Sequence, residues 1–199
     1  MSEHVVDTGR RKMLTVSASV VGVVGAAVAI VPFVSTMSPS ARALASGAPV
    51  EVDVSKLEPG QKIQVEWRRK PVWIVRRSDK MVSLLDSTEE RVRDPNSDEL
   101  GQQPQFARNQ ARSLKPDVLV LVGICTHLGC SPTFRPELAP ADLGPDWVGG
   151  FYCPCHGSSF DMAGRVYKNV PANKNLEVPP YKYISDNVIV VGELEEGAA

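Results

Sequence analysis

Cysteine and histidine side chains gather in two short segments of this chain, which we call box one (residues 125–130) and box two (residues 153–158). Box one has the spacing C-x-H-x-x-C, and box two begins with C-x-C-H. The six residues are Cys125, His127, Cys130, Cys153, Cys155 and His156. Thiolates and imidazoles are the side chains that bind zinc and iron–sulfur clusters in proteins. Because the boxes hold all four cysteines and two of the 3 histidines, their spacing predicts a metal centre.

The number of these potential ligands limits which metal centres are possible. Four cysteines and two histidines exceed the four ligands of one tetrahedral zinc ion. They suit a [2Fe–2S] cluster with two histidines on one iron, together with one disulfide, and such centres have potentials of roughly −150 to +300 mV. A structural zinc site and two ordinary disulfides are the alternatives, although two disulfides would leave the histidines unexplained. Four cysteines allow three disulfide pairings, and composition does not choose among them.

The elements that must position the boxes have the patterns of β-strands. Residues 118–124, VLVLVGI, are almost continuously apolar, which is typical of a buried strand, and they lead directly into Cys125. Residues 187–192, NVIVVG, predict a closing strand. The charged and proline-containing residues 87–116 predict an irregular segment with a short helix or two, packed over the sheet.

The first part of the predicted β domain shows alternation of apolar and polar residues. Residues 50–54 and 63–67 alternate with period two, and residues 72–75 form a short apolar run. Pro59 and Gly60 stand in the order that a type II turn favours. Together these patterns predict a meander of strands with one buried face.

The N-terminal region contains a long apolar segment. No charged residue or histidine occurs between Lys12 and Arg42. As a helix, residues 14–37 would span roughly 36 Å, which exceeds a hydrocarbon core of about 30 Å. Three positive residues precede this segment and one follows it, so the N-terminus is predicted to stay cytoplasmic. We therefore predict a transmembrane anchor at 13–37.

The residues on either side of the anchor carry their own signals. Arg10 and Arg11, within the N-terminal segment 1–12, resemble a twin-arginine export signal. The alternatives are that these arginines only set the topology, or that a signal peptide is cleaved near residues 43–45. We expect the anchor to be retained. Residues 38–48 are small, polar and punctuated by proline, which predicts a flexible hinge with a short helical turn at 41–45.

The whole pattern resembles the Rieske iron–sulfur proteins, specifically the bacterial iron–sulfur subunits of ubiquinol–cytochrome c reductase. The resemblance covers the paired arginines, the anchor, the hinge, both boxes and the loop at 170–172. It implies a mainly β fold, in which a Rieske-type antiparallel domain at 49–199 follows one transmembrane helix. A small cluster-binding subdomain is expected at about 120–170.

The resemblance also implies a role for each residue of the boxes. By the family pattern, Cys125 and Cys153 hold one iron of a single [2Fe–2S] cluster, and the other iron is held by His127 and His156. The two remaining cysteines, Cys130 and Cys155, pair as a disulfide that ties the two cluster loops together.

Further residues of the family pattern surround this cluster; they are Leu128, Gly157, Ser158, Phe160 and Pro171. Ser158 matches a serine that donates to a bridging sulfide, although a serine that merely caps a turn is the alternative. Phe160 stands where the family often has a tyrosine that donates to a ligand sulfur. A phenyl ring cannot donate, so this departure argues against a potential at the top of the range. Leu128 is expected to shield the cluster beside His127.

The function implied by the resemblance is electron transfer from ubiquinol to a c-type cytochrome within a quinol oxidoreductase. His156 would bind the quinol through its exposed ring nitrogen and take its proton. The expected partners are a cytochrome b subunit and a c-type cytochrome subunit in a dimeric complex of the bacterial inner membrane, with the C-terminal domain in the periplasm. Because the chain has no haem attachment motif, the haems are expected on these other subunits.

Other functions remain to be weighed. A small Rieske subunit of another electron-transfer enzyme, such as a molybdenum oxidase, is the main alternative. A ring-hydroxylating oxygenase needs a mononuclear iron held by two histidines and a carboxylate, but His4 is the only histidine outside the boxes. The net charge of −1 offers no basic excess for binding nucleic acid.

Overall fold

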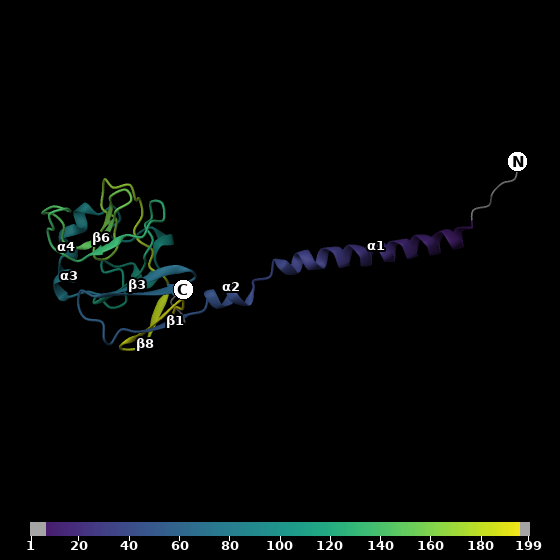
Figure 1. Ribbon diagram of the computed structural model, residues 1–199, viewed down its shortest axis with the longest axis horizontal. Coiled ribbons are helices and arrows are strands. Elements are labelled where there is room, and N and C mark those ends of the chain that lie inside the picture. The colour runs from purple at the N-terminus through teal and green to yellow at the C-terminus, as the bar shows by residue number, and fades with distance from the viewer. Residues whose placement is uncertain (1–6, 196–199) are drawn as a thin grey trace. The chain divides into compact units, whose positions relative to one another are not determined.

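The computed structural model describes residues 7–195, apart from the side chains of Arg42 and Ser46 (Figure 1). It divides into two compact units, Met1–Ala45 and Ser46–Ala199. Residues 1–6, which include His4 and half of the predicted N-terminal segment, lie outside the described residues.

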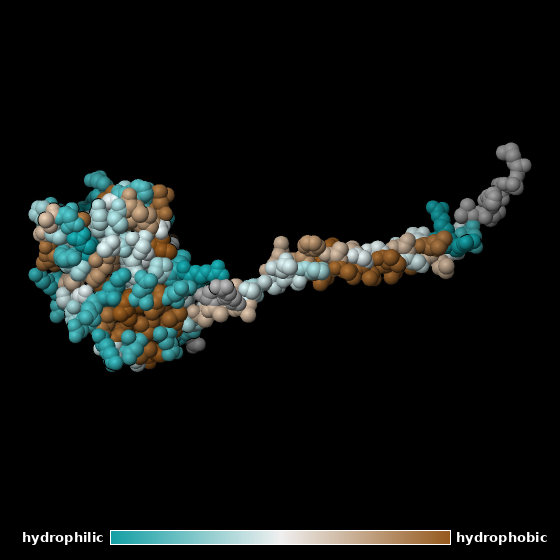
Figure 2. Space-filling view, in the orientation of Figure 1, coloured by the Kyte–Doolittle hydropathy of each residue, from teal (hydrophilic) through white to brown (hydrophobic). Residues whose placement is uncertain are grey.

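The first unit contains the helix α1, Thr8–Thr36, which is long and apolar enough to cross a membrane. The carboxylate of Asp7 caps it by accepting hydrogen bonds from the backbone N–H groups of Gly9 and Arg10 at 3.0 and 3.1 Å. This cap satisfies amides that would otherwise lack partners. The helix therefore begins before residue 13, where the anchor was predicted to start. None of its residues is buried, and Figure 2 shows apolar residues along most of its length.

A second, six-residue helix occupies most of the segment predicted as a hinge. This helix, α2, spans Ala41–Ser46 and confirms the predicted helical turn. Ser40 begins it, because its carbonyl accepts the N–H of Leu44 at 2.9 Å and its hydroxyl accepts the N–H of Ala43 at 3.2 Å. Whether the segment 38–48 flexes as a hinge stays a prediction.

The second unit is built on three antiparallel sheets of three strands each among the residues described. The first has the order β1-β9-β8, with β1 at Val50–Asp53, β8 at Tyr181–Ser185 and β9 at Val188–Val191. The second has the order β2-β3-β4, with β2 at Lys62–Trp67, β3 at Lys70–Arg76 and β4 at Val118–Val122. The third has the order β5-β6-β7, with β5 at Thr133–Arg135, β6 at Gly150–Cys153 and β7 at Ser158–Phe160.

The prediction of one continuous meander is wrong for the first strand. Strand β1 pairs with β9, from Val50 opposite Val191 to Asp53 opposite Val188, and not with β2. After β1 the chain leaves this sheet, and the N–H of Gly60 bonds to the carbonyl of Arg76 at the end of β3. Strands β2, β3 and β4 do form an antiparallel sheet, as their patterns predicted.

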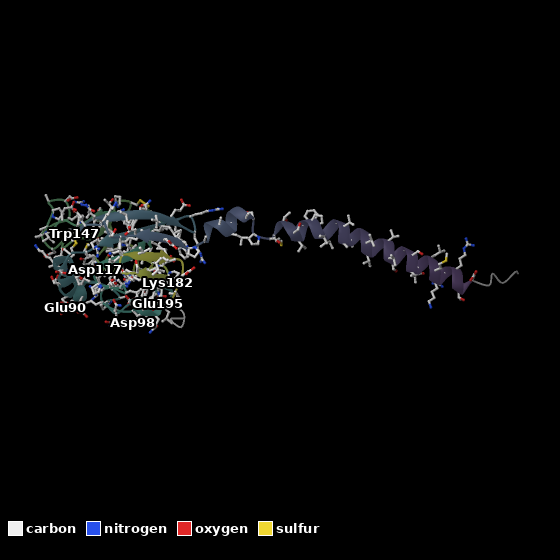
Figure 3. The ribbon with its side chains drawn as sticks, turned by 90° about the horizontal axis from the view of Figure 1, so that it is seen from below. Glu90, Asp98, Asp117, Trp147, Lys182 and Glu195 are labelled. Carbon is white, nitrogen blue, oxygen red and sulfur yellow. A yellow bond between two sulfur atoms is a disulfide. The ribbon has the colours of Figure 1, made fainter. Side chains whose placement is uncertain are left out.

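Short helices occupy much of the connection between β3 and β4. They are α3 at Asp79–Ser83, α4 at Leu85–Thr88 and three 3-10 helices at Glu89–Arg91, Leu100–Gln102 and Gln105–Ala107. The first helix begins earlier than predicted because Ser78 caps it by accepting from the N–H of Met81. Acidic side chains of this connection, such as Glu90 and Asp98, lie at the periphery of the unit (Figure 3).

The core of the second unit runs directly up to the two boxes. Every residue of β4 is buried, as the continuous apolar pattern predicted, and so is the run Val72, Trp73, Ile74 and Val75 of β3. Each such apolar side chain contributes about 1.5–3 kcal/mol when it is fully buried. Cys125 and Cys153 belong to the same buried cluster, so the core itself fixes where these two sulfurs lie.

Three fully buried arginines hold together the segments that flank the boxes. Arg165 forms an ion pair with Asp161 at 2.8 Å, and both side chains are fully buried. Arg112 donates to the carbonyls of Leu176 at 2.8 Å and of Ala163 at 3.1 Å. Arg77 donates to further carbonyls in the same region. These contacts tie the turn after box two to the chain that follows residue 170.

Candidate metal centre

Box one forms a closed loop directly after β4. The backbone N–H of Cys125 bonds to the carbonyl of Cys130 at 2.7 Å, and the N–H of Gly129 bonds back to the carbonyl of Cys125 at 3.0 Å. The two ends of the box are therefore adjacent, and His127 lies between them in the sequence. Cys125 is buried, whereas His127 is half-buried.

Box two forms the turn between β6 and β7. Cys153 is the last residue of β6 and pairs with Ser158 of β7. The N–H of Gly157 closes the turn on the carbonyl of Cys153 at 2.9 Å, and Gly157 has a φ of 76°, where a side chain would be strained. Between them, the three residues Pro154, Cys155 and His156 are exposed.

A third loop contacts both boxes. The hydroxyl of Ser158 in box two accepts the backbone N–H of Ala172 at 3.0 Å. The hydroxyl of Thr126 in box one donates to the carbonyl of Lys174 at 2.6 Å. The loop predicted from residues 170–172 is thus part of the site, although its central residue, Pro171, is exposed.

A disulfide joins the boxes directly. It links Cys130 to Cys155, whose Cα atoms are 6.7 Å apart and whose positions are separated by 25 residues. This is the pairing that the resemblance implied, and it leaves Cys125 and Cys153 as free thiols.

The two free thiols are 3% and 2% exposed. Burial raises the pKa of the Cys125 thiol above its ordinary value, while the backbone N–H of His127 and the hydroxyl of Ser158 partly offset this by bonding to the sulfur. Cys153 is a further partner of the same thiol. The sulfurs of Cys130, Cys153 and Cys155 also lie within 4.8 Å of one another, but two of them are consumed by the disulfide. Only Cys125 and Cys153 therefore remain available as thiolate ligands.

The two imidazoles are more exposed than these thiols. The rings of His127 and His156 are 4.8 Å apart between centroids and nearly perpendicular, at 89°. Two thiols and two imidazoles fit a [2Fe–2S] cluster with two cysteine and two histidine ligands. Because the disulfide removes the other two cysteines, the same four groups would also suffice for one zinc ion. The donor set alone does not separate these two metals.

Comparison with known proteins separates them. Residues 48–182 match the family model described as "Rieske [2Fe-2S] domain", and residues 1–40 match the "Ubiquitinol-cytochrome C reductase Fe-S subunit TAT signal". The chain is 57% identical to the ubiquinol–cytochrome c reductase iron–sulfur subunit of Allochromatium vinosum, covering 100% of this chain and 95% of that protein. The chain belongs to the Rieske iron–sulfur family.

Other relatives of this Rieske chain have similar names. The corresponding subunit of Bradyrhizobium diazoefficiens is 41% identical over 92% of this chain and 94% of that protein. A chain of a solved hyperthermophilic respiratory complex III is 28% identical, with a TM-score of 0.49, over 88% of this chain and 98% of that chain. Because residues 48–182 match the Rieske [2Fe-2S] domain, the cofactor is a [2Fe–2S] cluster and the zinc alternative is set aside.

The residues around the Rieske site divide into buried and exposed groups. Ser158 is fully buried, and its hydroxyl accepts the N–H of Ala172 at 3.0 Å; its donation to a sulfide stays a prediction. Phe160 is also fully buried and belongs to the core, in register with Phe151. Leu128 is 71% exposed, so it lies on the surface beside His127, and its shielding role stays a prediction.

Sequence reasoning missed several residues that hold the Rieske site together. These are Thr126, Lys174, Asn175, Arg112 and Arg165, together with Asp161. The amide of Asn175 accepts the N–H of Val166 at 2.9 Å and so fixes the base of the third loop. Arg165 and Asp161 pair with each other four residues apart, whereas Thr126 and Arg112 bond to backbone carbonyls far away in the sequence, which no local spacing signals.

Proposed function

We propose that Cys125 and Cys153 bind one iron of the cluster and that His127 and His156 bind the other. The burial of these side chains supports this assignment, because the thiols lie in the core and the imidazoles lie toward solvent. A cluster held by these residues would have its cysteine ligands in the core and its histidine ligands nearer to solvent. The disulfide between Cys130 and Cys155 then holds the two ligand loops together.

The chain is the electron-transfer subunit of a bacterial cytochrome bc1-type ubiquinol–cytochrome c reductase. The observation that carries this proposal is the match to the Allochromatium vinosum subunit over 100% of this chain and 95% of that protein, combined with the adjacent pair of histidine rings. When bound, the cluster accepts one electron and releases it again. Cytochrome b and c-type cytochrome subunits are the other components, in a complex that is dimeric.

His156 is the residue that meets ubiquinol. It is exposed at the tip of box two, whereas His127 is half-buried. The ring nitrogen of His156 that does not bind iron accepts a hydrogen bond from a quinol hydroxyl and takes up its proton. The exposed residues Leu128, Pro154 and Pro171 belong to the same three loops and offer an apolar surface for the quinol ring or for cytochrome b.

The helix α1 anchors the chain in the inner membrane, with the N-terminus in the cytoplasm and the second unit in the periplasm. Its length, its lack of charge beyond Lys12 and its 29 residues without a buried side chain support this placement. Arg10 and Arg11 are the export signal, which accords with the family model that matches residues 1–40. The anchor is not removed after export.

Affinity purification of the full-length chain from its own membranes tests the function. We expect b-type and c-type haems to co-purify, ubiquinol-dependent reduction of cytochrome c, and an EPR signal with the low average g value of a histidine-ligated [2Fe–2S] cluster. A purified chain with that signal but with a molybdenum-containing partner and no haem would contradict the proposal and favour a molybdenum oxidase subunit.

A further inference from the structure

One tryptophan lies between the two segments that lead into the boxes. Gly123 stands two residues before Cys125, and Phe151 stands two residues before Cys153. Trp73 of β3 contacts both of these residues and is only 1% exposed. It belongs to neither box, and no sequence pattern relates it to the site.

The indole of Trp73 packs so closely against Gly123 that residue 123 has no room for a Cβ atom. A Cβ atom at residue 123 would lie 2.2 Å from Cε2 of Trp73 and 2.6 Å from both Cζ2 and Nε1. Real Cβ atoms do not approach other atoms so closely, so only glycine fits between this indole and the chain that enters box one. The N–H of Gly123 also bonds to the carbonyl of Pro71 at 2.8 Å, which ties this segment to β3.

The contact with Phe151 joins the same indole to box two. The rings of Trp73 and Phe151 are stacked, with 5.5 Å between centroids and 15° between planes. Phe151 and Cys153 lie on the same face of β6, because alternate residues of a strand point the same way. A displacement of the phenyl ring would therefore move the strand that carries the Cys153 sulfur.

The orientation of the indole is itself fixed. Its Nε1 donates to the side-chain oxygen of Gln64 on the neighbouring strand at 2.9 Å. The ammonium group of Lys62, which also belongs to β2, lies over the ring at 4.3 Å from its centroid. A ring that is hydrogen-bonded, stacked and in contact with a glycine backbone has little freedom to shift.

We propose that Trp73 is a positioning residue of the cluster, which sets the separation between the sulfurs of Cys125 and Cys153. This inference rests on the ligand set of the proposed function. Gly123 precedes Cys125 by two residues, and Phe151 shares a face of β6 with Cys153, so a shift of either segment against the indole would change the hydrogen bonding and the solvent exposure of its sulfur. Hydrogen bonds to the sulfurs and solvent exposure set the potential of a cluster. Trp73 therefore influences the reduction potential of the cluster indirectly, by positioning the two segments that carry its cysteine ligands.

The test compares Trp73→Phe with Trp67→Phe in the full-length chain within its membrane complex. Trp67 is a matched control, because it is 4% exposed and also abuts a glycine, with a Cβ at Gly192 placed 2.5 Å from its Nε1. We expect Trp73→Phe to lower the equilibrium constant for reduction at least threefold, or about 28 mV for one electron. Trp67→Phe should change it by less than this, as measured by redox titration of the EPR signal.

Two further variants keep the test decisive if the first folds poorly. Gln64 is exposed, so Gln64→Leu removes the acceptor of the indole N–H without changing a core residue, and the potential should shift in the same direction. Gly123→Ala should reduce the iron content per chain severalfold by itself, and much less in the Trp73→Phe background, where the smaller ring leaves room for the methyl group.

The outcomes separate this inference from the proposed function. Equal shifts in Trp73→Phe and Trp67→Phe, or no shift in Gln64→Leu, would overturn the positioning role, as would additive losses of iron in the double variant. A wild-type chain without a [2Fe–2S] signal would instead overturn the proposed function, and the positioning role with it.

Discussion

The two proposed cysteine ligands are buried, whereas the two proposed histidine ligands are half-buried or exposed. Cys125 and Cys153 lie in the core, and an ionised thiolate there without a cation would be strongly disfavoured. The raised pKa of Cys125 expresses this cost. Binding of the cluster removes it, because iron takes the thiolate and the charge is shared. Cluster binding is therefore expected to stabilise the second unit as a whole.

The first prediction concerns the ligands themselves. Replacing Cys125, His127, Cys153 or His156 singly with Ala should abolish the [2Fe–2S] EPR signal and the acid-labile sulfide. The neighbouring Ser159→Ala is the control, because the hydroxyl of Ser159 donates to the carbonyl of Gly157, its backbone bonds are kept, and the variant should leave the cluster intact. Stoichiometric zinc with no iron in the wild-type protein would contradict the ligand assignment.

The second prediction concerns the hydrogen bond from Ser158. Reduction adds negative charge to the cluster, which a donor to sulfur stabilises by ~1.5–3 kcal/mol before losses to relaxation. Ser158→Ala should therefore lower the midpoint potential. It also leaves the buried N–H of Ala172 without its acceptor, so the free energy of unfolding should fall by about 1–3 kcal/mol. Redox titration and chemical denaturation measure the two effects, and an unchanged potential would mean that Ser158 only braces the third loop.

The third prediction uses the position where the chain departs from the family pattern. Phe160 is fully buried, and a hydroxyl placed there must find a partner or destabilise the core. If that partner is a ligand sulfur, Phe160→Tyr should raise the potential and speed up turnover where quinol oxidation limits the rate. An intact EPR signal at an unchanged potential would show that residue 160 does not face the sulfur.

At the scale of elements, the boxes are short loops that follow strands. A disulfide and hydrogen bonds between loops, rather than regular secondary structure, fix their conformation. The disulfide joins the end of box one to the turn of box two, whereas Ser158 and Thr126 connect each box to the third loop. Each tie acts between loops that are distant in sequence. The geometry of the site therefore depends on all three loops and on the strands beneath them.

The fourth prediction measures the contribution of the disulfide. Closing a loop of 25 residues restricts the unfolded chain, which corresponds to roughly 3–4 kcal/mol of stability. The double variant Cys130→Ala with Cys155→Ala removes the bond without leaving an unpaired thiol and keeps all four ligands. It should still take up a cluster but lose it several times faster on dilution. Retention at the wild-type rate would show that hydrogen bonds alone hold the loops together.

The elements that the sequence predicted well are those whose signal is local. The apolar run that forms β4 and the alternation in β2 each report burial of the strand itself. The pairing of β1 with β9 could not be read in this way, because it joins Val50 to Val191 across almost the entire second unit. Helix α1 extended further than predicted because a single side chain, Asp7, caps it.

The same distinction holds at the site. The spacing of the boxes marked every cysteine and histidine of the centre, and the family resemblance supplied the disulfide pairing that the structure contains. The contacts that position these residues were not predictable. Thr126 bonds to a carbonyl 48 residues away, and the buried Arg112 serves carbonyls at residues 163 and 176. Backbone carbonyls leave no mark on composition or spacing.

At the scale of the whole molecule, the two units differ in the polarity of their surfaces. The helix α1 exposes large apolar side chains along its length, such as Val21 at 72% and Phe33 at 75%, which soluble proteins rarely leave in water. The second unit instead buries most of its large apolar residues in one core that includes β3 and β4. A chain with this division is expected to place one unit in the bilayer and keep the other in water. Its function therefore depends on export of the second unit across the membrane.

The position of Arg10 and Arg11 in the structure sharpens the fifth prediction. Both lie in the first turn of α1, where the helix dipole disfavours positive charge by a few tenths of a kcal/mol or more. Since they do not help the helix, their presence is better explained by export or topology. Replacing both with Lys retains the charge but removes the guanidinium pair.

If the export machinery reads the pair itself, this variant should leave the second unit in the cytoplasm, protected from protease added outside spheroplasts. If only positive charge matters, export should be normal, and the twin-arginine interpretation would fail. Mass spectrometry of the exported wild-type chain tests the anchor in the same experiment. A retained α1 gives a mature protein that still contains Arg10 and Arg11, whereas a mature N-terminus between residues 43 and 48 would mean that α1 is a cleaved signal and that the second unit is held by its partners alone.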